Sequence, residues 1–584
     1  MMRDGFARGV PLGVAALAVY AALAPTTIVD GDNAEFASLA ALGGRAHPPG
    51  YPLYVLWLRA TSWLPAASAA HAAALATCVL AALAVVVLHA ACRAWGARPG
   101  AADAAAAIVA ASPLVLQVHT EAEVFALNGL AAACVLWLAA AGGPLRGVAR
   151  VAALGLVAGL GLANHPTCVL LAPVGLAGAV RGVREAPRWA RAVAAGVGAL
   201  ALGLAPYVYL AVAPDTAASW GQSTSAGALV DHVLRRDYGG ASAFAVSGEL
   251  DPLAQLAALA TALARGLVWA PLAVAVVAIA ARVRRGDDRV GWAALAVSWL
   301  ATCALVARFD LPVVGLGRHL VERFYLLPLV IATVPVAAGM ELVAARLGAR
   351  TVAAVAGWRA PALAIAAFVA LAAASAGRVR ALHAATLEHG LADVLDAMPR
   401  DAVLVVGADD LAFGTTYLQD VRGVRPDVTV VEWPMMTLPW YRERVAARGA
   451  VVPASDAGDP GDVASVRMAR ALLASGRPVL VGSFDMPIAR ALPSYPYAGV
   501  VRVLPPGAAI SLDAVVAENR AALARFDLSD PRPGPDDGYA TVARLRFAET
   551  WSRLATALDA AGHPDAAAAA RATAEQLGPD DDDD

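Results

Sequence analysis

Long apolar runs, separated by short polar stretches, recur through the first two thirds of the 584-residue chain. Runs of about 20 apolar residues are long enough to cross a membrane as helices. The pattern predicts a polytopic, mainly α-helical membrane protein with about eleven spans, near 9–29, 66–92, 101–118, 124–141, 149–163, 166–180, 192–213, 262–281, 290–307, 324–345 and 360–377.

The polar stretches differ in charge, and this difference predicts the orientation of the chain. Arginine concentrates near the N-terminus and in every second loop, at 93–98, 146–150, 181–191, 282–289 and 346–350. Because cytoplasmic loops carry the excess of basic residues, the N-terminus is expected in the cytoplasm. An odd number of spans then places the C-terminal region outside. The outer loops are 30–65, 119–123, 164–165, 214–261 and 308–323.

Two half-apolar segments of the first outer loop, 33–43 and 51–64, are too short to span and predict helices along the outer surface. From residue 378 the pattern becomes that of a water-soluble domain. Helical stretches alternate with short apolar runs, which favours an α/β domain with a largely parallel sheet. The expected strands are Ala402–Val406, Val428–Val431, Pro478–Val481 and Val500–Leu504, and the expected helices are 381–398, 438–447 and 463–475.

We therefore predict three parts: a transmembrane domain (1–377), a soluble α/β domain (378–535), and a helical pair with an acidic tail (536–584). The composition agrees, since 59% of the residues are hydrophobic and 16% are charged. All 45 cations are arginine, and the net charge of −2 argues against a nucleic-acid partner. The five cysteines form no CxxC pair, so neither a disulfide framework nor a zinc site is expected.

Three carboxylates follow the first span directly, at Asp30, Asp32 and Glu35. If a helix starts at Asn33, Asp32 and Glu35 share one face, and one of them is positioned to accept a proton from an attacking hydroxyl. The same spacing is also typical of a capping box, in which Asp32 is the N-cap and Glu35 reaches back to it. Asp30 precedes the pair and is expected to tolerate substitution by asparagine.

A rigid turn follows at His47-Pro48-Pro49-Gly50-Tyr51-Pro52, because three prolines and a glycine lie within six residues. Taken alone, this motif predicts a turn in which His47 is incidental. The large outer loop contains the paired residues Arg235 and Arg236, against the prevailing arginine bias. Arginine forks suit phosphate oxygens, although a solvated face is the alternative.

The segments GDNAEF and AHPPGYPLYVLWLR together resemble the N-terminal signature of the transmembrane O-mannosyltransferase-like family, within the GT-C superfamily of membrane glycosyltransferases. Asn33-Ala34 stand where this family usually has Ser-Gly. The resemblance continues in order along the chain, with Phe125 in place of a tyrosine. Its further blocks are Glu121–Asn128, Asn164–Thr167, Trp220-Gly221, Arg235–Gly239 and, in the soluble region, Tyr417–Gln419 and Val424–Val428.

The resemblance implies a GT-C-type fold and a glycosyltransferase in the inner membrane. The donor would be a polyprenyl-phosphate hexose, with mannose favoured, and the acceptor a hydroxyl of a protein Ser or Thr or of a glycan. Direct displacement would invert the anomeric carbon. No nucleotide-binding loop is found, no cofactor is expected, and a metal requirement is left open. Asp32 is predicted as the base and Glu35 as its partner. Substrate-binding residues are predicted at His47, Tyr51, Glu123, Asn128, His165, Trp220, Arg235, Arg236, Tyr238, Arg318 and Arg323.

Other interpretations stay open at this stage. Glu123 could be an interfacial residue at the end of a span, and His165 could be a turn histidine. Asp409-Asp410 follow a predicted strand, where α/β sheets often bind ligands, but turn chemistry is favoured there. A transporter or lipid-sugar flippase would need charges near the membrane midplane and repeated broken spans, and no repeat is found. A membrane-anchored binding module is the third class. We expect the soluble domain to serve acceptor recognition and not the chemical step.

Overall fold

The computed structural model describes residues 2–221, 225–236, 251–267, 270–286, 288–347, 360–449 and 461–580. The helices of the first part are α1 (Met2–Leu23), α2 (Gly31–Leu42), α3 (Pro52–Thr61), α4 (Ala69–Ala94), α5 (Pro99–Ala110), α6 (Pro113–Thr120), α7 (Phe125–Ala139), α8 (Gly147–Asn164), η1 (Pro166–Leu171), α9 (Ala172–Glu185), α10 (Trp189–Gly203), η2 (Ala205–Val208), α11 (Tyr209–Val212), α12 (Ala226–Val233), α13 (Pro252–Gly266), α14 (Ala270–Arg285), α15 (Arg289–Val306), α16 (Gly315–Glu322), η5 (Arg323–Tyr325), α17 (Leu326–Leu347) and α19 (Ala360–Leu382).

The first part is a bundle of apolar helices, as expected from the repeated runs. Eight helices of the described part are long and apolar enough to cross a membrane, and the pair α5–α6, bent by 64°, makes a ninth if it is one span. Two of the predicted spans are less regular. The span at 124–141 corresponds to α7, which has 15 residues. The span at 262–281 is wrong in its bounds, because it crosses from α13 into α14.

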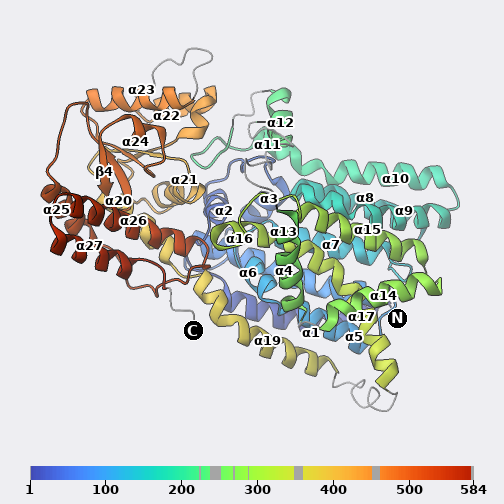
Figure 1. The fold of residues 1–584 in the computed structure, drawn as a ribbon. Coiled ribbons are helices and arrows are strands. Elements are labelled where there is room, and N and C mark those ends of the chain that lie inside the picture. The colour runs from blue at the N-terminus through green and yellow to red at the C-terminus, as the bar shows by residue number, and fades with distance from the viewer. Residues whose placement is uncertain are drawn as a thin grey trace.

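The two short helices of the first outer loop form where expected, but α2 does not lie on the surface. α3 begins with Pro52 at its first position, where a missing N–H costs nothing. α2 is buried over nine of its twelve residues because α21 (Asp409–Thr416) of the soluble domain covers it. Figure 1 shows α2 and α21 at the junction between the helical bundle and the soluble domain.

The soluble domain follows α19 without a long linker. Its elements are α20 (Thr386–Ala397), β1 (Val403–Val406), α21, η6 (Tyr417–Val421), β2 (Thr429–Glu432), η7 (Trp433–Thr437), α22 (Pro439–Ala447), α23 (Gly461–Ala474), β3 (Val479–Val481), α24 (Pro487–Ala491), β4 (Ser494–Tyr497), β5 (Val500–Val503), α25 (Leu512–Leu523), α26 (Tyr539–Ala560) and α27 (Pro564–Leu577).

All four predicted strands form, together with a fifth, in the order β2-β1-β3-β5-β4. β2, β1 and β3 are parallel, whereas β5 pairs antiparallel with both β3 and β4. The expectation of a largely parallel sheet is therefore only half right, because β4 and β5 form a hairpin at one edge. β1 is buried along its whole length, as its run of four apolar residues requires.

The soluble domain has a hydrophobic core of its own, separate from that of the bundle. This core includes residues of the sheet, of α20 and of the helical pair α26–α27. It also takes in Ile28, Ala34 and Ala37 from the segment around α2. The apolar face of α2 thus packs into the soluble domain, while Phe36 and Leu39 belong to the core of the bundle. The first outer loop is fixed between the two parts.

Candidate active site

The start of α2 is fixed by Asp30 and not by Asp32. The Asp30 carboxylate accepts a hydrogen bond from the backbone N–H of Asp32 at 2.9 Å, and the helix begins at Gly31. The predicted start at Asn33 and the capping box with Asp32 as N-cap are both wrong. Asp32 and Glu35 are free of any capping role, and their side chains leave the same helix three residues apart.

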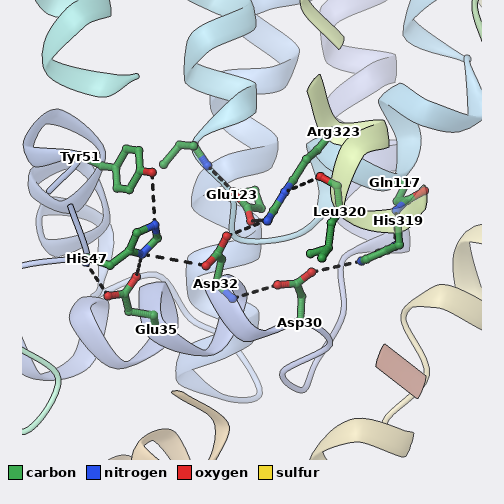
Figure 2. Close-up of polar contacts among 11 residues, drawn as sticks. Asp30, Asp32, Glu35, His47, Tyr51, Gln117, Glu123, His319, Leu320 and Arg323 are labelled. Atoms are coloured by element: carbon green, nitrogen blue, oxygen red, sulfur yellow. Dashed lines mark hydrogen bonds and ion pairs between the residues drawn. The ribbon is translucent and has the colours of Figure 1, made fainter. Parts of the chain in front are cut away.

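Asp32 and Glu123 share one arginine, from a segment far away in the sequence. Arg323 Nη1 donates to Asp32 Oδ2 at 2.8 Å and to Glu123 Oε1 at 2.7 Å. The three side chains are largely buried, with 18%, 19% and 3% of the Arg323, Asp32 and Glu123 side chains exposed. Figure 2 shows Arg323 between the two carboxylates. We call these three residues the arginine cluster.

Glu35, three residues further along α2, binds His47 of the turn motif. Glu35 Oε1 accepts the backbone N–H of His47 at 2.7 Å, and Oε2 lies 2.6 Å from the ring atom Nδ1. The remaining ring nitrogen of His47 lies 3.2 Å from the Tyr51 hydroxyl. His47 Nδ1 is 4.0 Å from Asp32 Oδ1, so the Glu35–His47 pair adjoins the arginine cluster (Figure 2).

The pKa values of Glu35 and His47 are both shifted upward. Burial raises the pKa of Glu35, although the adjacent His47 opposes the rise. Burial lowers the pKa of His47, but the Glu35 carboxylate outweighs it, so the His47 pKa lies above its ordinary value. The short contact between the two side chains and the upward shift of both pKa values have the same origin, since the two groups are buried against each other.

Two further predicted residues, Asn128 and His165, lie next to the turn motif. The Tyr51 ring stacks on His165 with centroids 5.7 Å apart. His165 Nδ1 lies 2.7 Å from the Thr167 hydroxyl, to which Asn128 Nδ2 also donates at 2.9 Å. Asn128 and His165 are thus at the site, but they contact Tyr51 and Thr167 and not the two carboxylates of α2.

Asp30 is a buried member of the site, which the sequence interpretation had set aside. Besides capping α2, it lies 3.1 Å from Nε2 of His319. Gln117 Nε2 lies 3.3 Å from the other ring nitrogen of His319. Because an amide NH₂ only donates, Nε2 of His319 is left to donate to Asp30. Burial raises the pKa of Asp30, but the His319 bond and the charge of Arg323 outweigh it and hold the pKa below its ordinary value.

The other predicted basic residues are divided between two environments. The charge of Arg235 acts on His47 and His165, so Arg235 is close to the turn motif. Arg236 instead forms an exposed ion pair with Asp231 at 2.6 Å. Arg318 donates to Glu322 at 2.6 Å and lies 3.6 Å from Asp536. Arg236 and Arg318 are therefore not brought to the two carboxylates, and Tyr238 lies outside the described residues.

The soluble domain contributes to the site, which the sequence interpretation missed. The Phe413 ring stacks on His47 with centroids 6.2 Å apart and contacts Trp220 at 5.9 Å. Asp409, one turn earlier in α21, is beside Gly31, where an added Cβ would lie 3.1 Å from the Asp409 Cβ. Burial raises the pKa of Asp409 to about 6, with Asp32 adding to the rise. The sequence signal for this residue was the position of Asp409 just after a strand, at the edge where such sheets bind ligands.

Two groups of three side chains have the composition of a metal site. They are Asp32, Glu35 and His47, and Asp30, Asp32 and Glu123, with ligand atoms within 4.8 Å of one another in each group. Oxygen and imidazole ligands suit a divalent cation. In the second group, however, the Arg323 guanidinium already binds Asp32 and Glu123. The residues therefore fit a cation only at Glu35 and His47. There the cation would have to enter between two side chains that already bind each other.

The chain is similar to known proteins over the segment that contains most of these residues. Residues 32–182 match the family model for the "Protein O-mannosyl-transferase TMEM260 N-terminal domain". This stretch contains Asp32, Glu35, His47, Glu123 and His165. The resemblance inferred from the motifs is confirmed. Of the residues labelled in Figure 2, the match leaves out Asp30 and the segment with His319, Leu320 and Arg323.

One relative and one solved structure extend the similarity beyond residues 32–182. Protein O-mannosyl-transferase TMEM260 of Mus musculus is 29% identical over 473 residues, which cover 76% of this chain and 65% of that relative. The crystal structure of ArnT from Cupriavidus metallidurans bound to undecaprenyl phosphate superposes with a TM-score of 0.52. The match covers 86% of this chain and 99% of ArnT, at 16% identity. The predicted GT-C-type fold is confirmed.

Proposed function

We propose that this protein is a membrane glycosyltransferase that transfers a hexose from a polyprenyl-phosphate donor to a hydroxyl group. The observation that carries the proposal is the arrangement around α2, where a buried arginine binds Asp32 beside the hydrogen-bonded Glu35–His47 pair. Such a site combines a carboxylate able to take a proton with a cation able to hold a phosphate. The mouse relative's name supports mannose as the sugar and protein as the acceptor.

In the proposed reaction, Asp32 acts as the general base. The acceptor hydroxyl gives its proton to the Asp32 carboxylate while its oxygen forms a bond to the anomeric carbon. The bond between that carbon and the phosphate oxygen breaks, and the oxygen departs with the electron pair. One displacement on the opposite face inverts the anomeric carbon. General-base help of this kind is worth roughly 10²–10⁴ in rate.

Arg323 and Arg235 are the proposed phosphate contacts. Arg323 reaches Asp32 and Glu123 from the side of the helical bundle, and Arg235 acts on the turn motif. A lipid phosphate near Arg323 would compete with the two carboxylates for the guanidinium, which frees Asp32 to act as a base. The ArnT structure, which holds undecaprenyl phosphate, supports a lipid phosphate as the donor class. Glu35 and His47 orient the acceptor, and Tyr51, Asn128 and His165 hold the turn motif in place.

The site is proposed to face the outside of the inner membrane, with the N-terminus in the cytoplasm. The placement of arginine in alternate loops supports this orientation. A reporter fused after Asp584 should be active only outside the cytoplasm. A fusion active only inside would contradict both the topology and the outward-facing site.

Sugar transfer by the purified full-length protein is the direct test. The protein is supplied with polyprenyl-phosphate mannose that carries a label in the sugar, and a peptide rich in Ser and Thr. The expected product is labelled peptide in which the anomeric carbon of the mannose has the inverted configuration relative to the donor. A lipid-sugar flippase, the alternative, would move the donor across a vesicle membrane without releasing free polyprenyl phosphate. Mass spectrometry of outer-face glycoproteins in a deletion strain then identifies the natural acceptor.

A further inference from the structure

A cleft of about 50 Å³ lies between α2 and the soluble domain. Three parts of the chain line it: α2, the outer-loop segment around Trp220, and the soluble domain from α21 to α22. Its lining residues are Glu35, Ser38, Ala217, Ala218, Ser219 and Trp220 from the first part, and Phe413, Thr416, Val430, Glu432, Met435, Trp440, Tyr441, Arg444, Val445 and Arg448 from the soluble domain. None of the roles proposed above uses the soluble-domain half.

The cleft is closed at α2 and open toward α22. Ser38 and Glu35 are 0% and 2% exposed, so they form its inner end. Arg448, by contrast, has 37% of its side chain exposed and lies at the mouth. A group entering from outside therefore reaches Glu35, which belongs to the same turn of α2 as Asp32. The cleft leads directly to the polar cluster.

The size of the cleft restricts what it can receive. On a scale where one water needs roughly 10–15 Å³, the cleft has room for only a few non-hydrogen atoms. That matches the hydroxymethyl or hydroxyethyl group of Ser or Thr, whereas a hexose ring with its substituents is too large. Aromatic rings form the walls, with Trp440 and Tyr441 centroids 5.6 Å apart and Phe413 beside Trp220.

The inner end has the chemistry that a hydroxyl needs. Both Glu35 oxygens already bind His47, but a carboxylate has about four lone-pair positions and can accept a further hydrogen bond. Glu432 lines the same cleft as a second carboxyl group. At the mouth, Arg444 stacks on Trp440 at 5.0 Å and binds Asp215 of the outer loop at 2.8 Å. This contact fixes the two walls relative to each other.

We propose that this cleft is the acceptor site, and that it receives the hydroxyl-bearing side chain of a polypeptide segment lying over Trp440 and Arg444. The inference rests on the proposed function and adds the location of the acceptor and its class, a polypeptide and not a glycan. Trp440, Glu432 and Phe413 thereby become specificity residues supplied by the soluble domain.

The test separates use of the donor from binding of the acceptor. Purified full-length variants Ala218→Phe, which fills the cleft, and Trp440→Ala, which removes a wall, are assayed in detergent. Two rates are measured: transfer of labelled mannose to a Ser/Thr peptide, and release of mannose to water. The matched control for the first variant is Ala557→Phe, on an exposed face of α26.

We expect the peptide KM to rise by about tenfold or more in both cleft variants, which corresponds to about 1.4 kcal/mol of binding. Release of mannose to water should stay within about twofold of wild type, since the donor side is untouched. An unchanged peptide KM in both folded variants, or an equal loss of both rates, would overturn the assignment. A wild-type protein that consumes no donor at all would contradict the proposed function instead, and the cleft assignment with it.

Discussion

Asp32 and Glu35 belong to one helical turn, yet they face different parts of the molecule. Asp32 points toward the helical bundle, where Arg323 connects it to Glu123. Glu35 binds His47 of the turn motif and also lines the cleft against the soluble domain. One carboxylate is thus paired with an arginine, and the other with a histidine.

The difference bears on the proposed transfer, which needs a donor site and an acceptor site. The arginine that binds Asp32 is available to an incoming phosphate. The Glu35 carboxyl group, held by His47, can accept a hydrogen bond from a hydroxyl in the buried cleft. We therefore assign the donor to the Asp32 side of α2 and the acceptor to the Glu35 side. The predictions below test this division.

The largest effect is expected for Asp32→Asn. An amide cannot take the proton, so the rate of transfer should fall by roughly 10²–10⁴ while the protein stays folded. Glu35→Gln should act mainly by raising the acceptor KM. Transfer rates and unfolding temperatures of the purified variants provide the measurements. If folded Asp32→Asn protein keeps a rate within about threefold of wild type, Asp32 is not the base, and His47 and Glu123 become the next residues to test.

Arg323→Met should impair both donor binding and stability. It leaves Asp32 and Glu123 without their buried cation, and breaking such a pair typically costs about 3–5 kcal/mol. Adding Glu123→Gln removes one of the two stranded charges, so the double variant should regain part of its stability but none of its donor affinity. Detergent-phase unfolding and the donor KM separate these two effects. Recovery of donor binding in the double variant would contradict a phosphate role for Arg323.

Asp30→Asn is expected to have a moderate effect, contrary to the tolerance predicted from the sequence. Asparagine still caps α2, since Asn and Asp are comparable N-caps. It loses the charge that binds His319, and a hydrogen bond to a charged group contributes about 1.5–3 kcal/mol. Asp30→Ala should be worse, because the cap is lost as well. Equal unfolding temperatures for wild type and both variants would rule out a positioning role for Asp30.

The smallest effect concerns pH and Glu432. Burial raises the pKa of Glu432 to about 8, so the folded protein binds this proton more tightly than the unfolded chain does. Stability contributed by this group therefore falls as the pH rises from the ordinary glutamate range toward 8, and changes no further above it. Glu432→Gln removes this dependence and should unfold at a higher temperature than wild type at pH 8, but not at pH 4. A decline of the same size in both proteins would exclude Glu432 as its source.

Local patterns in the sequence predicted the bundle, four of the five strands and the helical pair. β4 was missed because Ser494–Tyr497 is short and contains Pro496, which is typical of an edge strand and not of a central one. The start of α2 was placed two residues late, since Asp30 and Asp32 are equally good caps by type. In both cases the local signal was ambiguous and the tertiary packing decided.

The polar cluster was predicted only in part, because its members are far apart in the sequence. Asp32, Glu35 and His47 lie within 16 residues, and their proximity could be inferred from the motifs. Arg323 is separated from Asp32 by 291 residues. On sequence grounds Arg318, five residues earlier, was an equally good candidate for the site. Nothing in the sequence indicated which arginine faces the cluster, nor that Phe413 of the soluble domain would cover His47.

The contact between His319 and the start of α26 has a consequence for biosynthesis. Gly538 lies so close that an added Cβ would be 2.9 Å from Nδ1 of His319, and the Tyr539 ring contacts the same imidazole. His319 in turn holds Asp30, so the site depends on a helix that leaves the ribosome more than 200 residues after Arg323. At usual synthesis rates of about 5–20 residues per second, this delay is roughly 10–40 s. The membrane helices up to α19 are therefore synthesised before α26 can complete the contacts of His319.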